Sequence, residues 1–258
     1  MFINNVKKLT LIFILISNVA MGVDIDNLSK AVNISGKQRM FTQKMLKNYA
    51  MIGMNNTFGN PKKDLINIIN EFEDHQHSLR SYIKNKSFNL SLDNIQPLWE
   101  DTKSILLIKP EKSKAKKLQD NLNKLLIEAD KITKLLAKKS HKSSGEIINI
   151  SGRQRMLSQK MASLYMLKVW GFTDDKFKDK LNSSILLFKQ STKKLRNSNM
   201  NTDKIDKLLS NVDKSFMFFE MMAKAKSKFI PSLIYKKSND ILRDMNIVTA
   251  LYVIEDNK

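Results

Sequence analysis

The sequence NISGKQRMFTQKM occupies residues 33–45, and NISGRQRMLSQKM occupies residues 149–161. Ten of the thirteen positions are identical, and the other three exchange Lys for Arg, Phe for Leu and Thr for Ser. The second copy begins 116 residues after the first, and at the same offset Phe72 matches Phe188. Because this match lies far from the motif, we expect two copies of a whole structural module.

Composition favours long helices in both copies. The chain holds only 7 Gly and 4 Pro among 258 residues, too few turn-forming residues for a barrel or sandwich of many short strands. Breakers and periodicity divide residues 23–142 into four helices and residues 143–258 into four more, with Ser143 to Gly145 between the modules. The predicted fold class is all-α, with two tandem up-down four-helix bundles. The expected helices span residues 24–55, 61–85, 94–108, 110–140, 144–171, 174–197, 202–228 and 231–256.

One face of each repeated helix has the heptad spacing of a buried seam. Both seams are apolar at most positions and carry a Gln at the same position. A Gln in a seam usually fixes the register or bonds a partner helix, and we prefer this role to ligand binding. The seam residues are Ala31, Ile34, Gln38, Phe41, Met45 and Asn48 in the first copy, and Ile147, Ile150, Gln154, Leu157, Met161 and Leu164 in the second.

A second face of each repeated helix combines small residues with an arginine. Gly inside a helix costs about 1 kcal/mol relative to Ala, so its recurrence at Gly36 and Gly152 suggests that another backbone approaches there. Arg39 and Arg155 present planar donor forks suited to an oxyanion. We therefore expect a second helix-helix interface centred on the arginines. The candidate ligand-binding residues are Arg39, Arg155, Ser35, Ser151, Gln43 and Gln159.

A buried arginine on this face needs a negative partner. Acidic residues are scarce nearby, since Glu146 is the only carboxylate between residues 140 and 171. A bound small anion is one solution. The other is a structural salt bridge to an acidic side chain of another helix, for instance Glu71, Glu73 or Asp74. The sequence leaves both open.

The first 22 residues have the pattern of an export signal. Lys7 and Lys8 form a basic start, residues 9–16 are apolar, and Ala20 and Gly22 have the small-x-small spacing of a cleavage site. We expect cleavage after Gly22 and a periplasmic protein. An uncleaved anchor is the alternative, but a membrane-spanning helix needs about 20 apolar residues.

The chain is strongly basic, with 45 Lys and Arg against 25 Asp and Glu and a net charge of +20. Loss of Lys7 and Lys8 with the signal peptide would leave +18. An exported protein rarely meets nucleic acid, so anionic envelope surfaces, acidic partners or small anions are the expected counterparts. Much of the charge also fits simple solvated helix faces.

The string SGRQRMLSQKM at residues 151–161 resembles the PilJ-type family, the N-terminal sensor domain of type IV pilus chemotaxis transducers. It is more distantly similar to the NarX-like sensor domain, in which the resemblance implies that an Arg of the first helix binds nitrate between two facing copies. Arg39 and Arg155 match that Arg. However, Gln38 and Gln154 stand where nitrate sensors have other residues, so nitrate is only one candidate ligand. Receptors of the family continue into a signalling output, so we expect this chain to pass its state to a separate membrane partner.

Catalytic and metal-binding patterns are scarce, and we expect no enzyme, metal or cofactor. There is no Cys, His75 and His77 diverge on a helix, and His141 lies in the Lys-rich junction. Two hypotheses remain: a sensory module that captures a small anion, and a structural protein whose motif helices form a homodimer or dock on a receptor, pilus component or anionic surface. The modules could fold back so that the motif helices face each other, or stack as an elongated tandem, which we expect.

Overall fold

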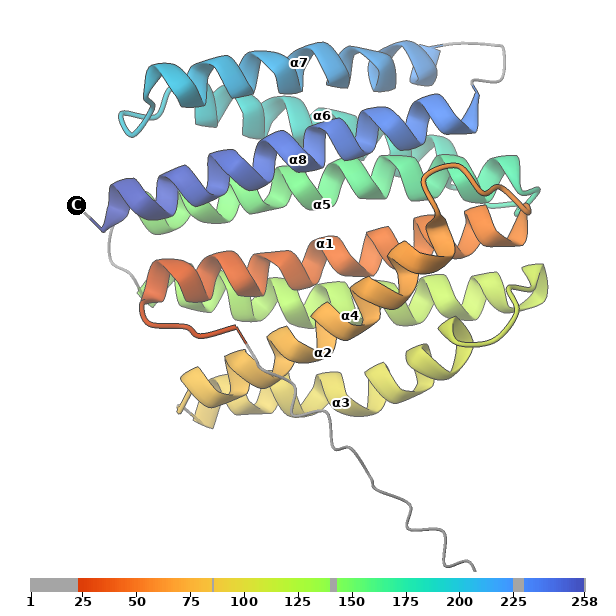
Figure 1. Ribbon diagram of the computed structural model, residues 1–258, viewed down its shortest axis with the longest axis horizontal. Coiled ribbons are helices and arrows are strands. Elements are labelled where there is room, and N and C mark those ends of the chain that lie inside the picture. Colours follow the sequence, from red (N-terminus) through yellow and green to blue (C-terminus); the bar gives the residue numbers. More distant parts are fainter. Residues whose placement is uncertain (1–22, 85, 140–142, 225–229, 258) are drawn as a thin grey trace, which may run out of the picture.

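The computed structural model describes residues 23–84, 86–139, 143–224 and 230–257, and in these residues it has eight α-helices and no strand (Figure 1). The all-α class is therefore confirmed. The predicted signal peptide, residues 1–22, and His141 lie outside the described residues. None of the described helices combines the length and apolar character that crossing a membrane requires. The helices are α1 (Leu28–Gly53), α2 (Pro61–Tyr82), α3 (Lys86–Leu106), α4 (Lys112–Lys139), α5 (Ser143–Val169), α6 (Phe177–Arg196), α7 (Asp203–Lys224) and α8 (Pro231–Asp256).

Local signals in the sequence account for several helix starts. The Asn27 side chain caps α1 by accepting a hydrogen bond from the Lys30 backbone N–H at 2.8 Å. Asn60 adopts a left-handed φ of 52° and its side chain accepts from the N–H of Lys63. Pro61 follows at the first position of α2, where its missing N–H costs nothing. The expected starts at residues 61 and 231 are confirmed.

Helix α3 differs from the expectation, because it begins at Lys86 and not at residue 94. Pro97 lies inside the helix, although a proline there removes one backbone hydrogen bond. Leu92, Ile95 and Trp99 are all at most 3% exposed, so the burial of this face offsets that cost. Residues 143–145 also differ, since they begin α5 and do not form the linker between the modules.

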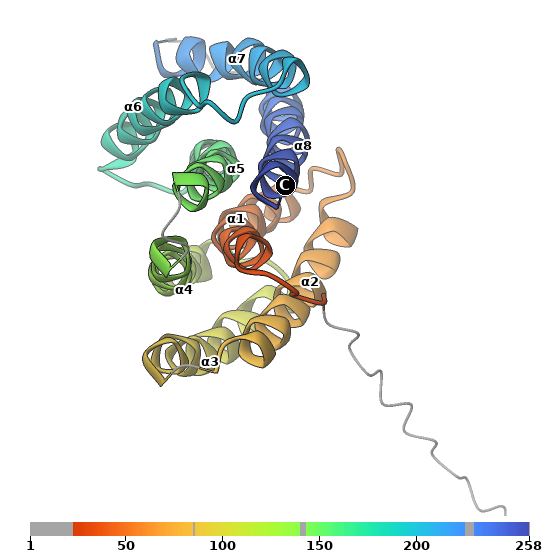
Figure 2. The same ribbon diagram turned by 90° about the vertical axis from the view of Figure 1, so that its left-hand side faces the viewer.

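The two modules lie side by side, and the expected elongated tandem is wrong. Helices α1 and α5 run parallel at the centre of the molecule, with the α2–α3 pair and the α6–α7 pair on opposite outer sides (Figures 1 and 2). Helix α4 packs on α1 and α8 packs on α5, so that α1, α4, α5 and α8 form a central bundle. A tandem arrangement would have left the arginine face of both motif helices in water. Packing α1 on α5 buries it.

Each module repeats the same internal packing. Gln38 Nε2 donates to the Phe72 carbonyl oxygen at 3.1 Å, and Gln154 Nε2 donates to the Phe188 carbonyl oxygen at 3.1 Å. The prediction that the seam Gln bonds a partner helix is therefore confirmed. The ring of Phe72 in turn packs on Trp99 in α3, as Phe188 packs on Phe216 in α7. Shared contacts of this kind hold the outer helices to α1 and α5.

Candidate functional site

The glycines of the repeated motif lie where α1 and α5 approach each other closely. A methyl group added at Gly152 would lie 3.9 Å from the Cα atom of Gly36, which is ordinary van der Waals contact between the two helices. The same methyl group would lie 3.1 Å from Nη2 of Arg155 and 3.3 Å from Nη2 of Arg39. Both guanidinium groups therefore lie over this glycine contact, and the space that a side chain would occupy holds the arginines instead.

Arg39 is completely buried and bonds two other helices. Its Nη1 donates to Oδ1 of Asp130 in α4 at 2.6 Å, and its Nη2 donates to the carbonyl oxygen of Asn149 in α5 at 3.2 Å. Burial lowers the pKa of Arg39, and the negative charge of Asp130 opposes that effect. Arg39 thus has a carboxylate partner, and it reaches across to the other copy of the motif.

Arg155 makes the same pattern of contacts with one chemical difference. It is also completely buried, its Nη2 donates to the carbonyl oxygen of Asn33 in α1 at 3.3 Å, and its Nη1 donates to Oδ1 of Asn246 in α8 at 3.1 Å. Asn246 is a neutral amide at the position equivalent to Asp130. Burial and the repulsion of Arg39 lower the pKa of Arg155 to about 9, so this guanidinium still carries its charge at neutral pH.

The centre of the molecule therefore holds more positive than negative charge. Lys37 and Arg153 are two further cations near the arginines. Burial and then the charge of Arg155 lower the pKa of Lys37, and the charge of Arg153 contributes to the lowered pKa of Arg39. Burial acts to raise the pKa of Asp130, but Arg39 and Lys134 hold it below its usual value. Asp130 is thus an ionised carboxylate that compensates only part of this charge.

Each arginine also has one buried donor without an acceptor. In the described part of the chain, Nε of Arg39 and Nε of Arg155 are buried and make no hydrogen bond. The two atoms are equivalent in the repeat. An unpaired buried N–H on a charged group costs more free energy than one on a neutral group, so both Nε atoms are donors that lack an acceptor at a cost in stability.

The predicted serines bond within their own helices, while the predicted glutamines also bond the other module. Gln43 Oε1 accepts from Ser163 in α5 at 3.5 Å, and Gln159 Oε1 accepts from Lys47 in α1 at 2.6 Å. The hydroxyl groups of Ser35 and Ser151 donate to carbonyl oxygens three residues earlier in their own helices, at 3.0 and 2.9 Å. Gln43 donates to Thr42, and Gln159 donates to the carbonyl oxygen of Ser238 in α8 at 2.9 Å. The structure therefore brings together the arginines and the glycines, while the serines and glutamines support the helices around them.

Sequence reasoning missed Asp130 and Asn246, and it proposed the wrong acids. The partner of Arg39 comes from α4 and not from Glu71, Glu73 or Asp74 of α2. Glu73 instead accepts from the indole N–H of a tryptophan in α3, since this side of α2 faces α3. A usable signal was present, because Asp130 and Asn246 are also 116 residues apart.

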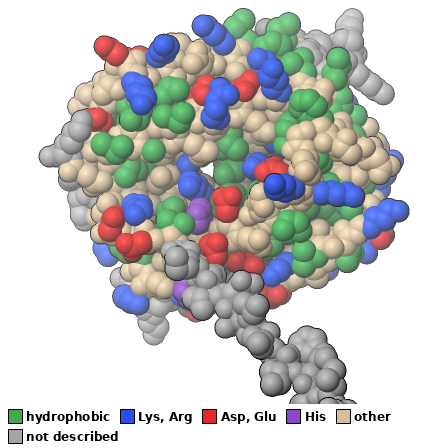
Figure 3. All heavy atoms as spheres, viewed as in Figure 1, with side chains coloured by type: hydrophobic (Ala, Val, Ile, Leu, Met, Phe, Trp, Pro, Cys, Tyr) green, Lys and Arg blue, Asp and Glu red, His purple; other side chains and the backbone are tan. Residues whose placement is uncertain are grey.

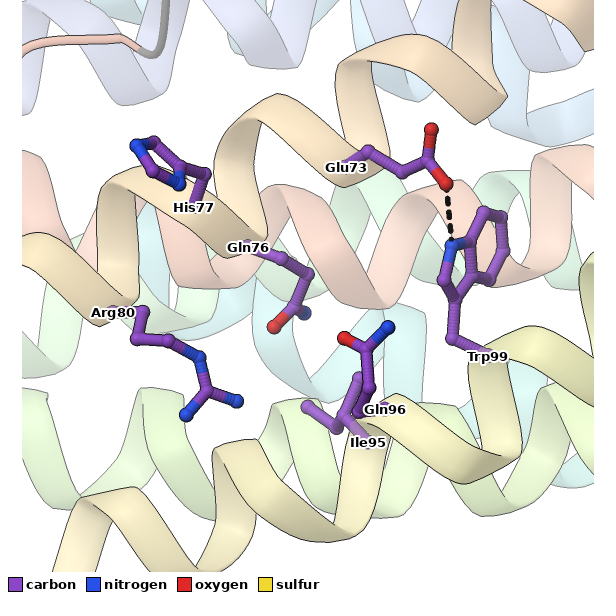
Figure 4. A pocket seen from close by; sticks show the side chains of 7 residues that line it. All are labelled: Glu73, Gln76, His77, Arg80, Ile95, Gln96 and Trp99. Carbon is purple, nitrogen blue, oxygen red and sulfur yellow. Dashed lines mark hydrogen bonds between the residues drawn. The ribbon is translucent and has the colours of Figure 1, made fainter. Parts of the chain in front are cut away.

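Three hollows at the surface are lined by residues other than Arg39 and Arg155. One of about 260 Å³ opens between α2 and α3, where Figure 4 shows Glu73 bonded to Trp99 at one end and His77 and Arg80 at the other. Its remaining lining residues are Gln76, Ile95 and Gln96. Among the described residues no group of three or more His, Cys, Asp or Glu could hold a metal ion. The buried arginine pair is therefore the chemically distinctive site.

A comparison with known proteins agrees with the repeated architecture. The family model described as type IV pili methyl-accepting chemotaxis transducer N-term (PilJ) matches residues 24–125 and again residues 136–216. No curated protein and no solved structure gives a significant match. The two family matches together cover more than half of the 258 residues, and each match contains one copy of the arginine motif. The chain therefore belongs to the PilJ family of sensory, non-catalytic transducer domains and contains two copies of it.

Proposed function

We propose that this protein is a periplasmic sensor that binds a small anion, of the nitrate or nitrite type, between Arg39 and Arg155. One observation carries the proposal. Two completely buried guanidinium groups meet over Gly36 and Gly152, and only one of them bonds a carboxylate. A charge buried without an ionic partner is costly, and a bound anion would supply that partner.

The chemistry of the site fits a small oxyanion. A guanidinium group donates through a planar fork that matches trigonal and tetrahedral oxyanions. The buried Nε of each arginine provides a further donor. A small ion suits a site at a close helix crossing, where large ligands would have to separate α1 from α5.

The fold offers a route by which such a sensor would communicate with a membrane partner. The starts of α1 and α5 and the ends of α4 and α8 lie at one end of the molecule (Figure 1). At that end the Ser29 hydroxyl bonds the Asp256 carboxylate, which joins the start of α1 to the end of α8. Two conformations could differ in the position of α1 relative to α5. An anion that binds one of them more tightly would increase its population. The partner would read this shift at the shared end.

A structural role is the second candidate, because the Nη2 atoms of Arg39 and Arg155 each donate to a carbonyl oxygen of the other motif helix and so already join the modules. In this alternative the arginines join the helices and no ligand is involved. The basic surface does not by itself favour docking on an anionic envelope. Figure 3 shows Lys and Arg side chains spread over the visible face and interspersed with Asp and Glu.

The two functions differ in how the folded protein responds to anions. We would follow thermal unfolding of the protein in nitrate, nitrite, sulfate, phosphate and small carboxylates at constant ionic strength. A ligand at 100 times its dissociation constant should add about 2.7 kcal/mol to the free energy of unfolding. The variant with both Arg39→Ala and Arg155→Ala should lose this response.

The control is Arg243→Ala, which removes an arginine whose side chain is 64% exposed on α8. It should keep the response of the unmodified protein. If no anion stabilises the unmodified protein, while the modules of the double arginine variant lose their contact with each other or unfold, the arginines are structural and the sensory proposal fails.

A further inference from the structure

We infer that the two halves of the proposed anion site are not equivalent: Asp130 is a built-in anion for Arg39, and Arg155 beside Asn246 is the half that receives a singly charged ligand. This inference rests on the proposed function. Positions 130 and 246 then determine which anions the site selects.

The repeat makes the difference between the halves easy to isolate. The arginines, the glycines and the Asn carbonyl groups that accept from the arginines all occur in both copies. Asp130 and Asn246 stand at equivalent positions and bond equivalent Nη1 atoms, at 2.6 Å for the carboxylate and 3.1 Å for the amide. The exchange of one carboxylate for one amide is therefore the main chemical difference around the guanidinium groups.

A second residue shows that the first half is organised around its carboxylate. The other oxygen of Asp130 forms an ion pair with Lys134 at 2.6 Å. The position equivalent to Lys134 is Ala250. The second half therefore lacks both the carboxylate and the additional lysine that pairs with it.

The charge balance determines the class of ligand. Asp130 neutralises one of the two buried guanidinium charges, and the charge of Arg155 remains. Lys37 and Arg153 are only partly buried, so water and salt screen their charges. For the two completely buried guanidinium groups and Asp130, a ligand with a single negative charge restores neutrality, whereas a doubly charged anion would carry an uncompensated charge into a buried site, which is costly. Singly charged oxyanions are therefore favoured over sulfate.

An amide at position 246 suits the half of the site that receives the ligand better than a carboxylate would. Its oxygen accepts from Arg155, while an Asn side chain also has two N–H donors that can face an anion. A carboxylate at this position has only acceptors and would repel a negative ligand. The Asn246 side chain thus orients Arg155 without competing with the anion for the guanidinium group.

The test exchanges the two residues separately. We would measure apparent dissociation constants for nitrate and sulfate, from the anion dependence of thermal unfolding, in Asn246→Asp and in Asp130→Asn. Asn246→Asp supplies Arg155 with an internal carboxylate, so nitrate binding should weaken about tenfold to a hundredfold, the range for one charge-assisted hydrogen bond. Asp130→Asn leaves both guanidinium groups without a carboxylate, so sulfate should bind about tenfold more tightly and the preference for nitrate should disappear.

Asn239→Asp is the matched control. Asn239 lies seven residues before Asn246 on α8, about 10 Å along the helix, and bonds the Lys47 ammonium group. The substitution adds the same charge outside the arginine site, so the dissociation constant for nitrate should change by less than about threefold, since Coulomb interactions weaken with distance.

The outcomes separate the two proposals. If the unmodified protein binds no anion, both the proposed function and this inference fail. If the unmodified protein and Asn246→Asp bind nitrate equally tightly, the proposed anion site is supported and the inference that its two halves differ is wrong. Equal weakening in Asn239→Asp and Asn246→Asp would also overturn the inference, because the effect would then reflect overall charge and not the contact with Arg155.

Discussion

The imidazole of His75 is buried in the first module, in surroundings that disfavour its protonated form. It packs beside the ring of Phe41, and burial, followed by the charges of Lys37 and Arg155, lowers its pKa to about 3. In the unfolded chain a histidine takes up its proton near pH 6.5. Below that pH the unfolded state therefore binds a proton that the folded state does not, and the free energy of unfolding falls until about pH 3.

We expect His75→Leu to remove this acid sensitivity. The slope for one proton is about 1.4 kcal/mol per pH unit, so between pH 6.5 and 5 the unmodified protein should lose about 2 kcal/mol that the variant retains. Denaturant unfolding at the two pH values measures the difference. His77, which is exposed on the other side of α2, provides the control, since His77→Leu removes a histidine while His75 stays buried beside Phe41. Equal acid sensitivity in all three proteins would contradict the prediction.

At the residue scale the sequence predicted the arginine site only in part. Helical spacing placed Gly36 and Arg39 on one face, because residues three apart lie on the same side of a helix. It could not identify Asp130, since that contact depends on how α4 packs against α1. The buried ammonium group of Lys47 was missed for the same reason, because its partners Gln159 and Asn239 belong to other helices.

At the scale of elements, the end of α1 depends on a glycine that leaves room for the ring of Trp170, the residue that follows the end of α5. A methyl group added at Gly53 would lie 2.2 Å from the Trp170 indole ring, and this ring packs edge-on against Tyr49 of α1. The ring cannot move without disturbing the contact between α1 and α5. The glycine is thus needed for the close approach of the tryptophan.

We expect Gly53→Ala to destabilise the protein by about 1 to 3 kcal/mol, the usual cost of overpacking, despite the better helix propensity of Ala. Chemical denaturation measures this change. Adding Trp170→Leu should remove the clash, so that Gly53→Ala costs little in that background. Additive effects of the two substitutions would show that the ring is not the obstacle.

Element boundaries were predictable where a local signal fixes them. Pro61 and Pro231 occur at first-turn positions, which only the start of a helix accommodates well. Pro97 lies inside α3, where buried side chains on both sides of it outweigh the one hydrogen bond that it removes, and the helix extends back to Lys86. The composition therefore predicted long helices correctly, while their limits depended on tertiary packing.

For the whole molecule, the parallel pairing of α1 with α5 predicts that each module would pair with itself if separated. A homodimer of the fragment 23–142 would contain two copies each of Arg39 and Asp130. A homodimer of the fragment 143–258 would contain two buried arginines that face two amides. We expect the first fragment to dimerise without added anions. The second should dimerise only when nitrate or a similar anion balances its charge.

Analytical ultracentrifugation of each fragment, with and without nitrate, measures this difference. Nitrate should shift the second fragment from monomer towards dimer and leave the first fragment nearly unchanged. Arg155→Gln in the second fragment should permit pairing without the anion. Folded monomers of both fragments under all conditions would contradict the prediction.

The arrangement of the modules was the main feature that the sequence left undecided. The offset of 116 residues predicted two similar units, but a repeat does not specify how its copies pack. The short connection between α4 and α5 suggested a continuous rod, whereas the two helices run side by side in opposite directions (Figure 1). Burial of the arginine faces determines the outcome.

The covalent link between the two copies has a consequence for how such a site can evolve. In a symmetric homodimer every substitution is encoded once and appears in both halves, so a change that helps one half is also imposed on the other. Here the two motif helices are encoded separately and remain paired at any dilution, because their association is intramolecular. Each half can therefore accumulate its own substitutions without losing its partner, as one polypeptide carries both sides of the interface.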